Sequence, residues 1–247
     1  MMQIPISLQL YTLRAALQKN PLETLERVAQ IGYSGIEAGL DSTSEFLNKA
    51  RELNLKITAA HVSLAALRGD IEDIVSKCQA METSFAVLSW IEESERGDAQ
   101  KWQDLGRFLD EKGAQLHEGG ITLCYHNHDF EFQSFDGKFG LDWLFEAASP
   151  QYLQAELDTY WVQKGGASPV EYLKKYAGRV PLLHIKDMTP DGDFAEIGEG
   201  ILDWPAIFAT AQAQGVTSYI VEQDECAGDP FDSIALSLEN LRKMGQI

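Results

Sequence analysis

Residues 4–39, IPISLQLYTLRAALQKNPLETLERVAQIGYSGIEAG, contain the pattern from which the fold prediction starts. A short apolar run opens the segment, and a second apolar run, GIEAG at 35–39, closes it. Between them lies the amphipathic stretch 21–32, which begins with proline and ends with glycine, as helices often do. The segment therefore predicts a strand–helix–strand unit.

The same alternation continues along the chain with a period of about 30 residues. Further amphipathic segments occupy 42–54, 101–120 and 168–178, and another helix is expected to begin near Asp203. No low-complexity segment or long linker interrupts the pattern, so we predict a single domain over residues 1–247. The apolar runs interpreted as strands are residues 4–11, 35–39, 56–62, 84–90, 121–128, 153–161, 180–187 and 218–224.

Eight strand–helix units in 247 residues predict an α/β fold of the (β/α)₈ (TIM) barrel type, closed by parallel strands. The main alternative is a doubly wound open sheet. The turn after the first run, residues 10–20, lacks the glycine-rich phosphate-binding motif of many such sheets, although not all of them carry it. The regular repeat favours the barrel.

The charge of the chain limits its partners. Asp and Glu number 38 against 20 Lys and Arg, a formal net charge of -18, so the protein repels nucleic acid backbones and anionic membranes. Cys78, Cys124 and Cys226 are far apart and flanked by apolar residues, which predicts buried free thiols in a reducing compartment. With no apolar run of membrane-spanning length and no basic leader, a cytoplasmic location is expected.

Polar and aromatic residues gather where the predicted strands end, the edge at which barrels of this type carry their active sites. Four of the five histidines lie there. We interpret six residues as candidate substrate-binding residues: Tyr11, Glu37, His61, Trp90, Trp161 and Lys186. The other polar residues at these ends are Gln9, His126, His128, Asp158, His184, Asp187, Glu222 and Asp224.

Imidazoles and carboxylates at one barrel mouth suit a divalent metal. Side chains alternate along a strand, so His126 and His128 are expected on one face. Such ligands favour Mn²⁺, Co²⁺, Zn²⁺ or Fe²⁺, with Mg²⁺ less favoured. Taken singly, His61 could be a packed histidine, Asp158 a helix cap and Glu222 a solvated strand end; together they favour a site.

Six segments carry a resemblance to a known family: GYSGIEAG (32–39), YHNHDFEF (125–132), ELDTYW (156–161), LLHIKDM (182–188), EIGEGILDW (196–204) and YIVEQD (219–224). With them the chain resembles the xylose isomerase-like superfamily, the sugar phosphate isomerase/epimerase group, over essentially its whole length. The resemblance implies one divalent metal held by Asp158, His184 and Glu222. His126 would be the fourth ligand, where the family's epimerases have a glutamate that also acts as acid/base.

The resemblance implies an isomerase or epimerase of sugars or keto-sugars that acts through an enediolate. A base must remove the proton, and Glu222, Glu131 and His128 are the candidates, while Lys186 could stabilise the enediolate oxygen. A dehydratase or lyase of keto-sugars or inosose is the alternative on the same site. A non-catalytic sugar-binding barrel and an endonuclease IV-like repair enzyme are less favoured, the latter because it needs a basic groove. The expected partner is a small sugar or polyol, and a homo-oligomer is left open.

Overall fold

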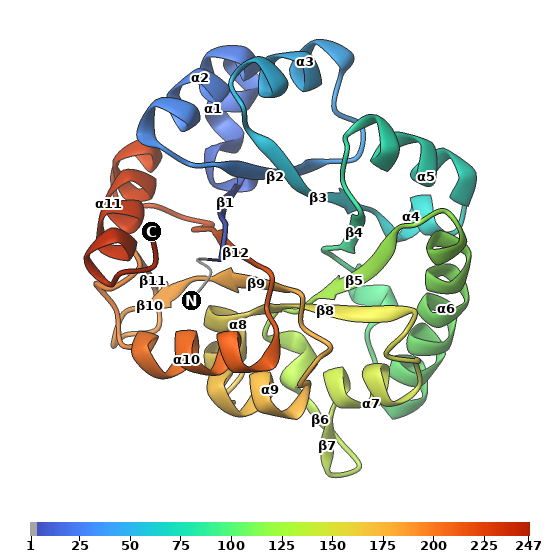
Figure 1. Ribbon diagram of the computed structural model, residues 1–247. Helices are drawn as coiled ribbons and strands as arrows, with labels where there is room; N and C mark the ends of the chain where they lie inside the picture. Colours follow the sequence, from blue (N-terminus) through green and yellow to red (C-terminus); the bar gives the residue numbers. More distant parts are fainter. Residues whose placement is uncertain (1–3) are drawn as a thin grey trace.

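Eight parallel strands close into a barrel in the computed structural model, which describes residues 4–247 (Figure 1). The first and last strands join, with Ile6 opposite Tyr219, so the sheet has no free edge. The (β/α)₈ prediction is therefore confirmed. In barrel order the strands are β1 (Ile6–Gln9), β12 (Ser218–Val221), β9 (Leu182–Ile185), β8 (Leu153–Asp158), β5 (Thr122–His126), β4 (Phe85–Leu88), β3 (Lys56–Val62) and β2 (Gly35–Gly39).

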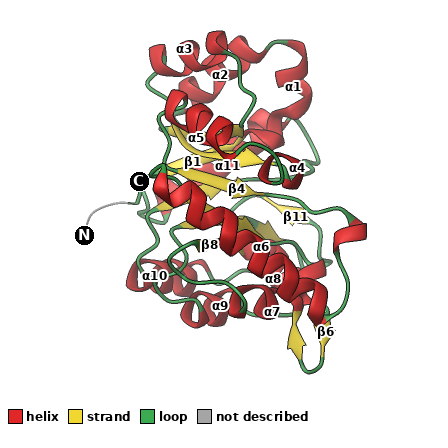
Figure 2. Cartoon of the chain, turned by 90° about the vertical axis from the view of Figure 1, so that its right-hand side faces the viewer, coloured by secondary structure: helices red, strands yellow, loops and turns green. Residues whose placement is uncertain are grey.

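Helices surround the barrel (Figures 1 and 2). They are α1 (Arg14–Lys19), α2 (Pro21–Ile31), α3 (Ser44–Glu52), α4 (Leu64–Leu67), α5 (Ile71–Ala80), α6 (Ala99–Glu118), α7 (Gly140–Glu146), α8 (Thr159–Lys164), α9 (Pro169–Lys175), α10 (Trp204–Gln214) and α11 (Pro230–Lys243). Within residues 4–247, no helix is long and apolar enough to cross a membrane.

Short elements occupy several connections. Three are 3₁₀ helices, η1 (Leu10–Leu13), η2 (Glu93–Glu95) and η3 (Phe130–Phe132). Two hairpins are formed by β6 (Ser134–Phe135) with β7 (Lys138–Phe139), and by β10 (Asp187–Met188) with β11 (Phe194–Ala195). The β6–β7 hairpin projects from the side of the molecule opposite the C-terminus (Figure 2).

Local signals explain where the opening unit begins and ends. Asn20 caps α2 by accepting a hydrogen bond from the Glu23 backbone, Pro21 occupies the first turn, and Gly32 ends the helix with φ +111°. Two predicted strands, 35–39 and 56–62, match β2 and β3. Others were predicted too long: the run 4–11 is a strand only to Gln9, and 153–161 only to Asp158, because η1 and α8 begin at the next residue.

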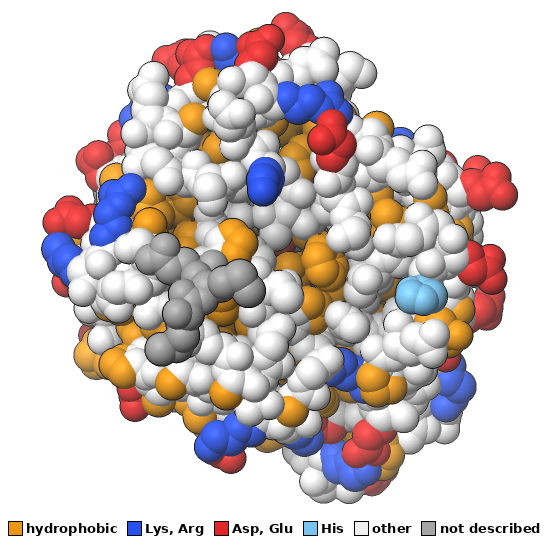
Figure 3. Space-filling model, viewed as in Figure 1, with side chains coloured by type: hydrophobic (Ala, Val, Ile, Leu, Met, Phe, Trp, Pro, Cys, Tyr) orange, Lys and Arg blue, Asp and Glu red, His pale blue; other side chains and the backbone are white. Residues whose placement is uncertain are grey.

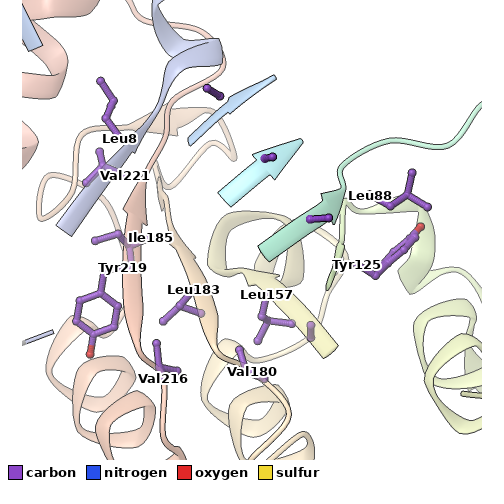
Figure 4. Packing of buried hydrophobic residues seen from close by; sticks show 14 of the residues in the cluster. Leu8, Leu88, Tyr125, Leu157, Val180, Leu183, Ile185, Val216, Tyr219 and Val221 are labelled. Carbon is purple, nitrogen blue, oxygen red and sulfur yellow. The ribbon is translucent and has the colours of Figure 1, made fainter. Parts of the chain in front are cut away.

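Because side chains alternate along the strands, the apolar residues form two separate regions, one between the strands and the helices and one inside the barrel. Outward side chains such as Leu183, Ile185, Tyr219 and Val221 pack between the strands and the surrounding helices (Figure 4). Inside the barrel a smaller apolar layer consists of Ala59, Val87, Cys124, Leu182 and Ile220, all fully buried. All three thiols are free, as predicted, but Cys226 is only half-buried.

The two ends of the barrel differ in chemistry. Figure 3 shows one end of the barrel, with acidic side chains mostly around the rim. A cavity of about 630 Å³ at the strand starts is lined largely by apolar and hydroxyl side chains, among them Ser7, Thr58, Phe85 and Ser218. The histidines and carboxylates lie at the other end, above the inner apolar layer.

Candidate active site

The polar cluster is built by the period of the strands. Within β3, β5, β9 and β12, the residue two positions after a member of the inner apolar layer points into the barrel again, one level higher. In each of these strands or directly after it, that residue is a histidine or a glutamate. The four are His61 after Ala59, His126 after Cys124, His184 after Leu182, and Glu222 after Ile220.

Four buried side chains form a group that can hold a metal: His126, Asp158, His184 and Glu222, whose ligand atoms all lie within 4.8 Å of one another. We call them the metal group. His184 Nδ1 is 3.1 Å from Glu222 Oε2 and 3.9 Å from Asp158 Oδ2. His126 Nε2 is also 3.9 Å from Asp158 Oδ2. The sequence thus predicted the members of this group correctly as neighbours.

Asp158 shows that the residues suit an ion. Its Oδ1 caps α8 by accepting the Trp161 N–H at 2.9 Å, whereas its Oδ2 is buried and makes no hydrogen bond within residues 4–247. Lys186 Nζ lies 3.3 Å from this oxygen and balances part of its charge, while the lone pairs of Oδ2 remain free for an ion. Two imidazoles and two carboxylates suit a first-row divalent ion such as Mn²⁺, Co²⁺, Zn²⁺ or Fe²⁺.

Beneath the metal group lies a second layer of charged side chains. Glu37 and Glu156 are fully buried there and both contact His184 Nε2, at 2.8 and 3.0 Å. His61 Nε2 is 3.1 Å from Glu37 and 3.5 Å from Glu156, and Gln9 donates to Glu37 at 3.1 Å. Glu37, predicted to bind substrate, therefore lies under the floor of the site.

Lys186, predicted to contact substrate, is also buried. Its Nζ forms ion pairs with Asp158 at 3.3 Å, Glu222 at 2.9 Å and Asp224 at 2.5 Å. Burial alone would lower its pKa, but Asp158, Glu222 and Asp224 raise the pKa well above the ordinary range, so the side chain is a cation. It brings a fixed positive charge next to Glu222.

Burial and neighbouring charges raise the pKa values of some groups in the site and lower those of others. Burial would lower the pKa of His61, but hydrogen bonds to Glu156 and Glu37 raise it to about 9. Burial and the nearby Lys186 lower the pKa of His128 to about 3, so this imidazole is neutral. Burial raises the pKa of Asp158 to about 6 against the opposing charges of Lys186 and His184.

A pocket of about 540 Å³ opens above the cluster, within the usual range for small-ligand sites. Seven residues predicted for the site line it: Tyr11, His61, Trp90, His126, His128, Trp161 and Glu222. Two of these, Tyr11 and Trp90, are large and half-exposed, at 52% and 48%. The pocket combines a polar floor with an aromatic wall.

Glu131, a predicted base, lies away from the metal group. Its carboxylate accepts hydrogen bonds from the Tyr125 hydroxyl and the His128 backbone N–H, both at 2.8 Å. Tyr125 packs against Phe145 of α7, so this glutamate belongs to the layer between barrel and helices. In this position it fixes the backbone of His128.

Sequence reasoning missed several residues of the site, among them Glu156 and Arg96. Glu156 precedes Asp158 by two residues in the segment ELD, so strand alternation could have placed both on the inner face. Arg96 follows η2 and lines the pocket, with its guanidinium 3.5 Å from the centre of the Phe130 ring. No sequence signal distinguishes Arg96 from other arginines. Phe130 lines the pocket as well.

Known proteins share both this fold and parts of the sequence. A family model described as a xylose isomerase-like TIM barrel matches residues 25–244. The chain belongs to this family. Within residues 4–247, a closed barrel with a polar cluster at the strand ends agrees with that membership.

Relatives of this xylose isomerase-like protein include enzymes named inosose dehydratase. The one from Geobacillus kaustophilus is 26% identical over 165 residues, covering 58% of this chain and 53% of that protein. The chain thus matches about half the length of that relative. The one from Bacillus anthracis is 23% identical over 254 residues, covering 85% of each chain.

Solved structures of xylose isomerase-like barrels superpose over nearly the whole chain. A sugar phosphate isomerase/epimerase from Parabacteroides distasonis has a TM-score of 0.86 at 21% identity, covering 100% of this chain and 96% of that one. The 3-keto-D-glucoside 4-epimerase from E. coli has a TM-score of 0.73 at 16% identity, covering 98% and 100%. At these identities the likeness establishes the fold.

Proposed function

We propose that this protein is a divalent-metal-dependent isomerase or epimerase of sugars or keto-sugars. The observation that carries the proposal is the metal group, four buried residues whose ligand atoms lie within 4.8 Å of one another, directly below a pocket for a small molecule. His126, Asp158, His184 and Glu222 would hold the ion. A bound divalent ion polarises a carbonyl and makes the adjacent C–H acidic.

Two side chains on the pocket lining are placed to move the proton. Glu222 reaches the pocket and is held by Lys186 and His184, whose charges keep the pKa of its carboxylate low although burial would raise it. His128 lines the same pocket as a neutral imidazole with a buried Nδ1 that has no hydrogen-bond partner within residues 4–247. Two proton carriers at one pocket suit epimerisation, in which a proton leaves one face of a carbon and another returns on the opposite face.

The remaining groups would bind and orient the substrate. His61, cationic because Glu37 and Glu156 hold its proton, is within reach of a substrate oxygen at the edge of the floor. Trp90 and Trp161 can pack against the apolar face of a sugar ring, and Tyr11 lies at the opening. Lys186 acts from behind Glu222 by its positive charge, which favours negative charge on a substrate enediolate.

A dehydratase of inosose or keto-sugars is the second candidate, favoured by the relatives named inosose dehydratase. Both reactions begin with removal of a proton from the carbon next to a carbonyl. They differ in whether the proton returns to carbon or a β-hydroxyl leaves. A product lighter by one water would identify the dehydratase.

The test is deuterium incorporation. Ketohexoses and an inosose are incubated with the Mn²⁺-loaded protein in D₂O and followed by NMR. We expect deuterium at the carbon next to the carbonyl of the true substrate, and we expect chelator to stop the exchange. Asp158→Asn, which removes a metal-group carboxylate, should lose about 10²-fold or more in exchange rate.

A shielded base could return the same proton without exchange, so substrate deuterated at that carbon serves as the second measurement. Product that forms without solvent deuterium, without label migration and without a primary isotope effect would exclude enolisation. Full activity in chelator would exclude the metal.

A further inference from the structure

Glu37 and Glu156 lie beneath the metal group without belonging to it. Both are fully buried, and neither lines the substrate pocket. Placing two carboxylates in a barrel interior is costly unless they serve hydrogen bonds or charges there. Their partners include both histidines of the metal group.

The two ring nitrogens of His184 face different groups, one toward Glu37 and Glu156 and the other toward the metal group. Nε2 lies 2.8 Å from Glu37 and 3.0 Å from Glu156, whereas Nδ1 lies 3.1 Å from Glu222 and 3.9 Å from Asp158. An imidazole that binds a metal ion is neutral and carries one N–H and one lone pair, which faces the ion. With the hydrogen on Nε2, facing two carboxylates, the lone pair of Nδ1 faces the metal group.

In His126 the two nitrogens have exchanged roles, with Nδ1 toward Glu156 and Nε2 toward the metal group. Its Nδ1 lies 3.0 Å from Glu156 Oε1, and its Nε2 faces Asp158 Oδ2 at 3.9 Å. A hydrogen on Nδ1 therefore leaves Nε2 free toward the metal group. Glu156 alone receives hydrogens from both histidines, at a single oxygen, Oε1.

A second metal ion among Glu37, His61, Glu156 and His184 is the competing interpretation, because their ligand atoms also lie within 4.8 Å of one another. The distances favour hydrogens. Three of the four contacts of Glu37 and Glu156 with His61 and His184 measure 2.8 to 3.1 Å, the range of hydrogen bonds, whereas ligand atoms around a tetrahedral zinc lie about 3.3 Å apart. An ion there would also require His184 to bind metal with both nitrogens.

We propose that Glu37 and Glu156 are positioning residues that fix the tautomers of the two metal-binding histidines, with Nε2–H in His184 and Nδ1–H in His126. This inference rests on the proposed function, because it takes the metal group as the ion site. Carboxylates behind histidine ligands also increase their basicity, and losing such a partner usually costs 10–100-fold in metal affinity.

The first measurement is the zinc affinity of the whole protein, by competition with a chromophoric chelator. Glutamine keeps the size of the side chain and removes its charge. Glu156→Gln, which affects both histidines, should weaken binding by about 10–100-fold, and Glu37→Gln, which affects one, by less. Glu131→Gln controls for replacing a buried glutamate near the site, since Glu131 is equally buried but contacts Tyr125 and the His128 backbone. Its affinity should equal that of the wild type.

The second measurement is the tautomer itself. In zinc-loaded protein labelled with ¹⁵N-histidine, long-range ¹H–¹⁵N NMR should show the hydrogen on Nε2 of His184 and on Nδ1 of His126. This uses the wild type, so it holds even if Glu156→Gln does not fold. The opposite tautomers would overturn the proposal.

Three results separate this inference from the proposed function. A wild type that binds no divalent ion overturns both. A wild type that binds one ion, with Glu37→Gln and Glu156→Gln binding equally well, overturns the positioning role alone. A wild type that binds two ions, one of which is lost in Glu156→Gln, overturns it in favour of a second metal centre.

Discussion

At the scale of single residues, Glu131 has a measurable effect on stability. Burial raises the pKa of its carboxyl from 4.5 to about 8, against hydrogen bonds from Tyr125 and His128. The folded chain therefore binds this proton more tightly than the unfolded chain does. The associated stabilisation is complete below pH about 4.5 and is lost as the pH rises through about 8.

We therefore expect Glu131→Gln to gain stability relative to the wild type as the pH rises from about 5 to about 8.5, by a few kcal/mol. Urea unfolding at the two pH values measures the difference. Glu118→Gln, an exposed glutamate at the end of α6, is the control and should change nothing. A pH-independent difference between wild type and Glu131→Gln would show that the carboxyl is ionised in the folded protein.

Strand alternation and the barrel mouth predict from sequence that His126, His184 and Glu222 lie together, whereas their choice as metal ligands came from the family resemblance. Glu156 is harder to recognise from sequence, because its role depends on its contacts with His126 and His184 on the two neighbouring strands. Glu131 shows the opposite case: it is adjacent to the histidines in sequence, but a 3₁₀ turn carries it to the outside of the barrel.

At the scale of elements, Asp187 organises the connection from β9 to α10. Its carboxylate accepts five hydrogen bonds: from the backbones of Met188, Gly198, Gly200 and Leu202, and from Trp204 Nε1. The chain passes so close that a Cβ on Gly200 would lie 2.2 Å from Asp187 Oδ1. The glycines of the segment 196–204 thus permit a tight wrap around one buried acid.

Asp187→Asn should lower the free energy of unfolding by about 3 kcal/mol or more. The asparagine NH₂ group would face N–H donors of the chain in a buried site, so hydrogen bonds would be lost there. Asp203→Asn is the control: this residue caps α10, and asparagine caps a helix about as well. Chemical denaturation of both variants measures the difference. Equal losses would mean that the loop does not depend on the Asp187 carboxylate.

The element boundaries that sequence missed share one cause. The apolar runs 4–11 and 153–161 continue past the strand into a helix, and the aromatic residues there, Tyr11 and Trp161, are as typical of strands as of packed helices. Caps decide the boundary: Asp158 accepts the Trp161 N–H, and that hydrogen bond is a property of the folded chain.

At the scale of the whole molecule, the metal group connects half of the barrel, since its members come from β5, β8, β9 and the residue after β12. An ion that binds only the folded chain stabilises it by about 2.7 kcal/mol at a hundred times its dissociation constant. For a chain of this size that corresponds to a rise in Tm of about 5–10 °C.

Thermal unfolding with Mn²⁺ or with chelator should show this rise in the wild type and lose it in Asp158→Asn. The comparison with Asp158→Asn is needed because a net charge of -18 also attracts divalent ions to the rest of the surface. Equal shifts in both proteins would assign the effect to the surface and leave the metal group without an ion.

The pairing of β1 with β12 also determines when the site can exist during synthesis. Ile6 finds its partner Tyr219 only after most of the chain has left the ribosome, and Glu222 follows three residues later. Until then the edges of β1 and β9 are unpaired, and the metal group lacks its fourth member, Glu222. Barrel closure and completion of the metal group are therefore one late event.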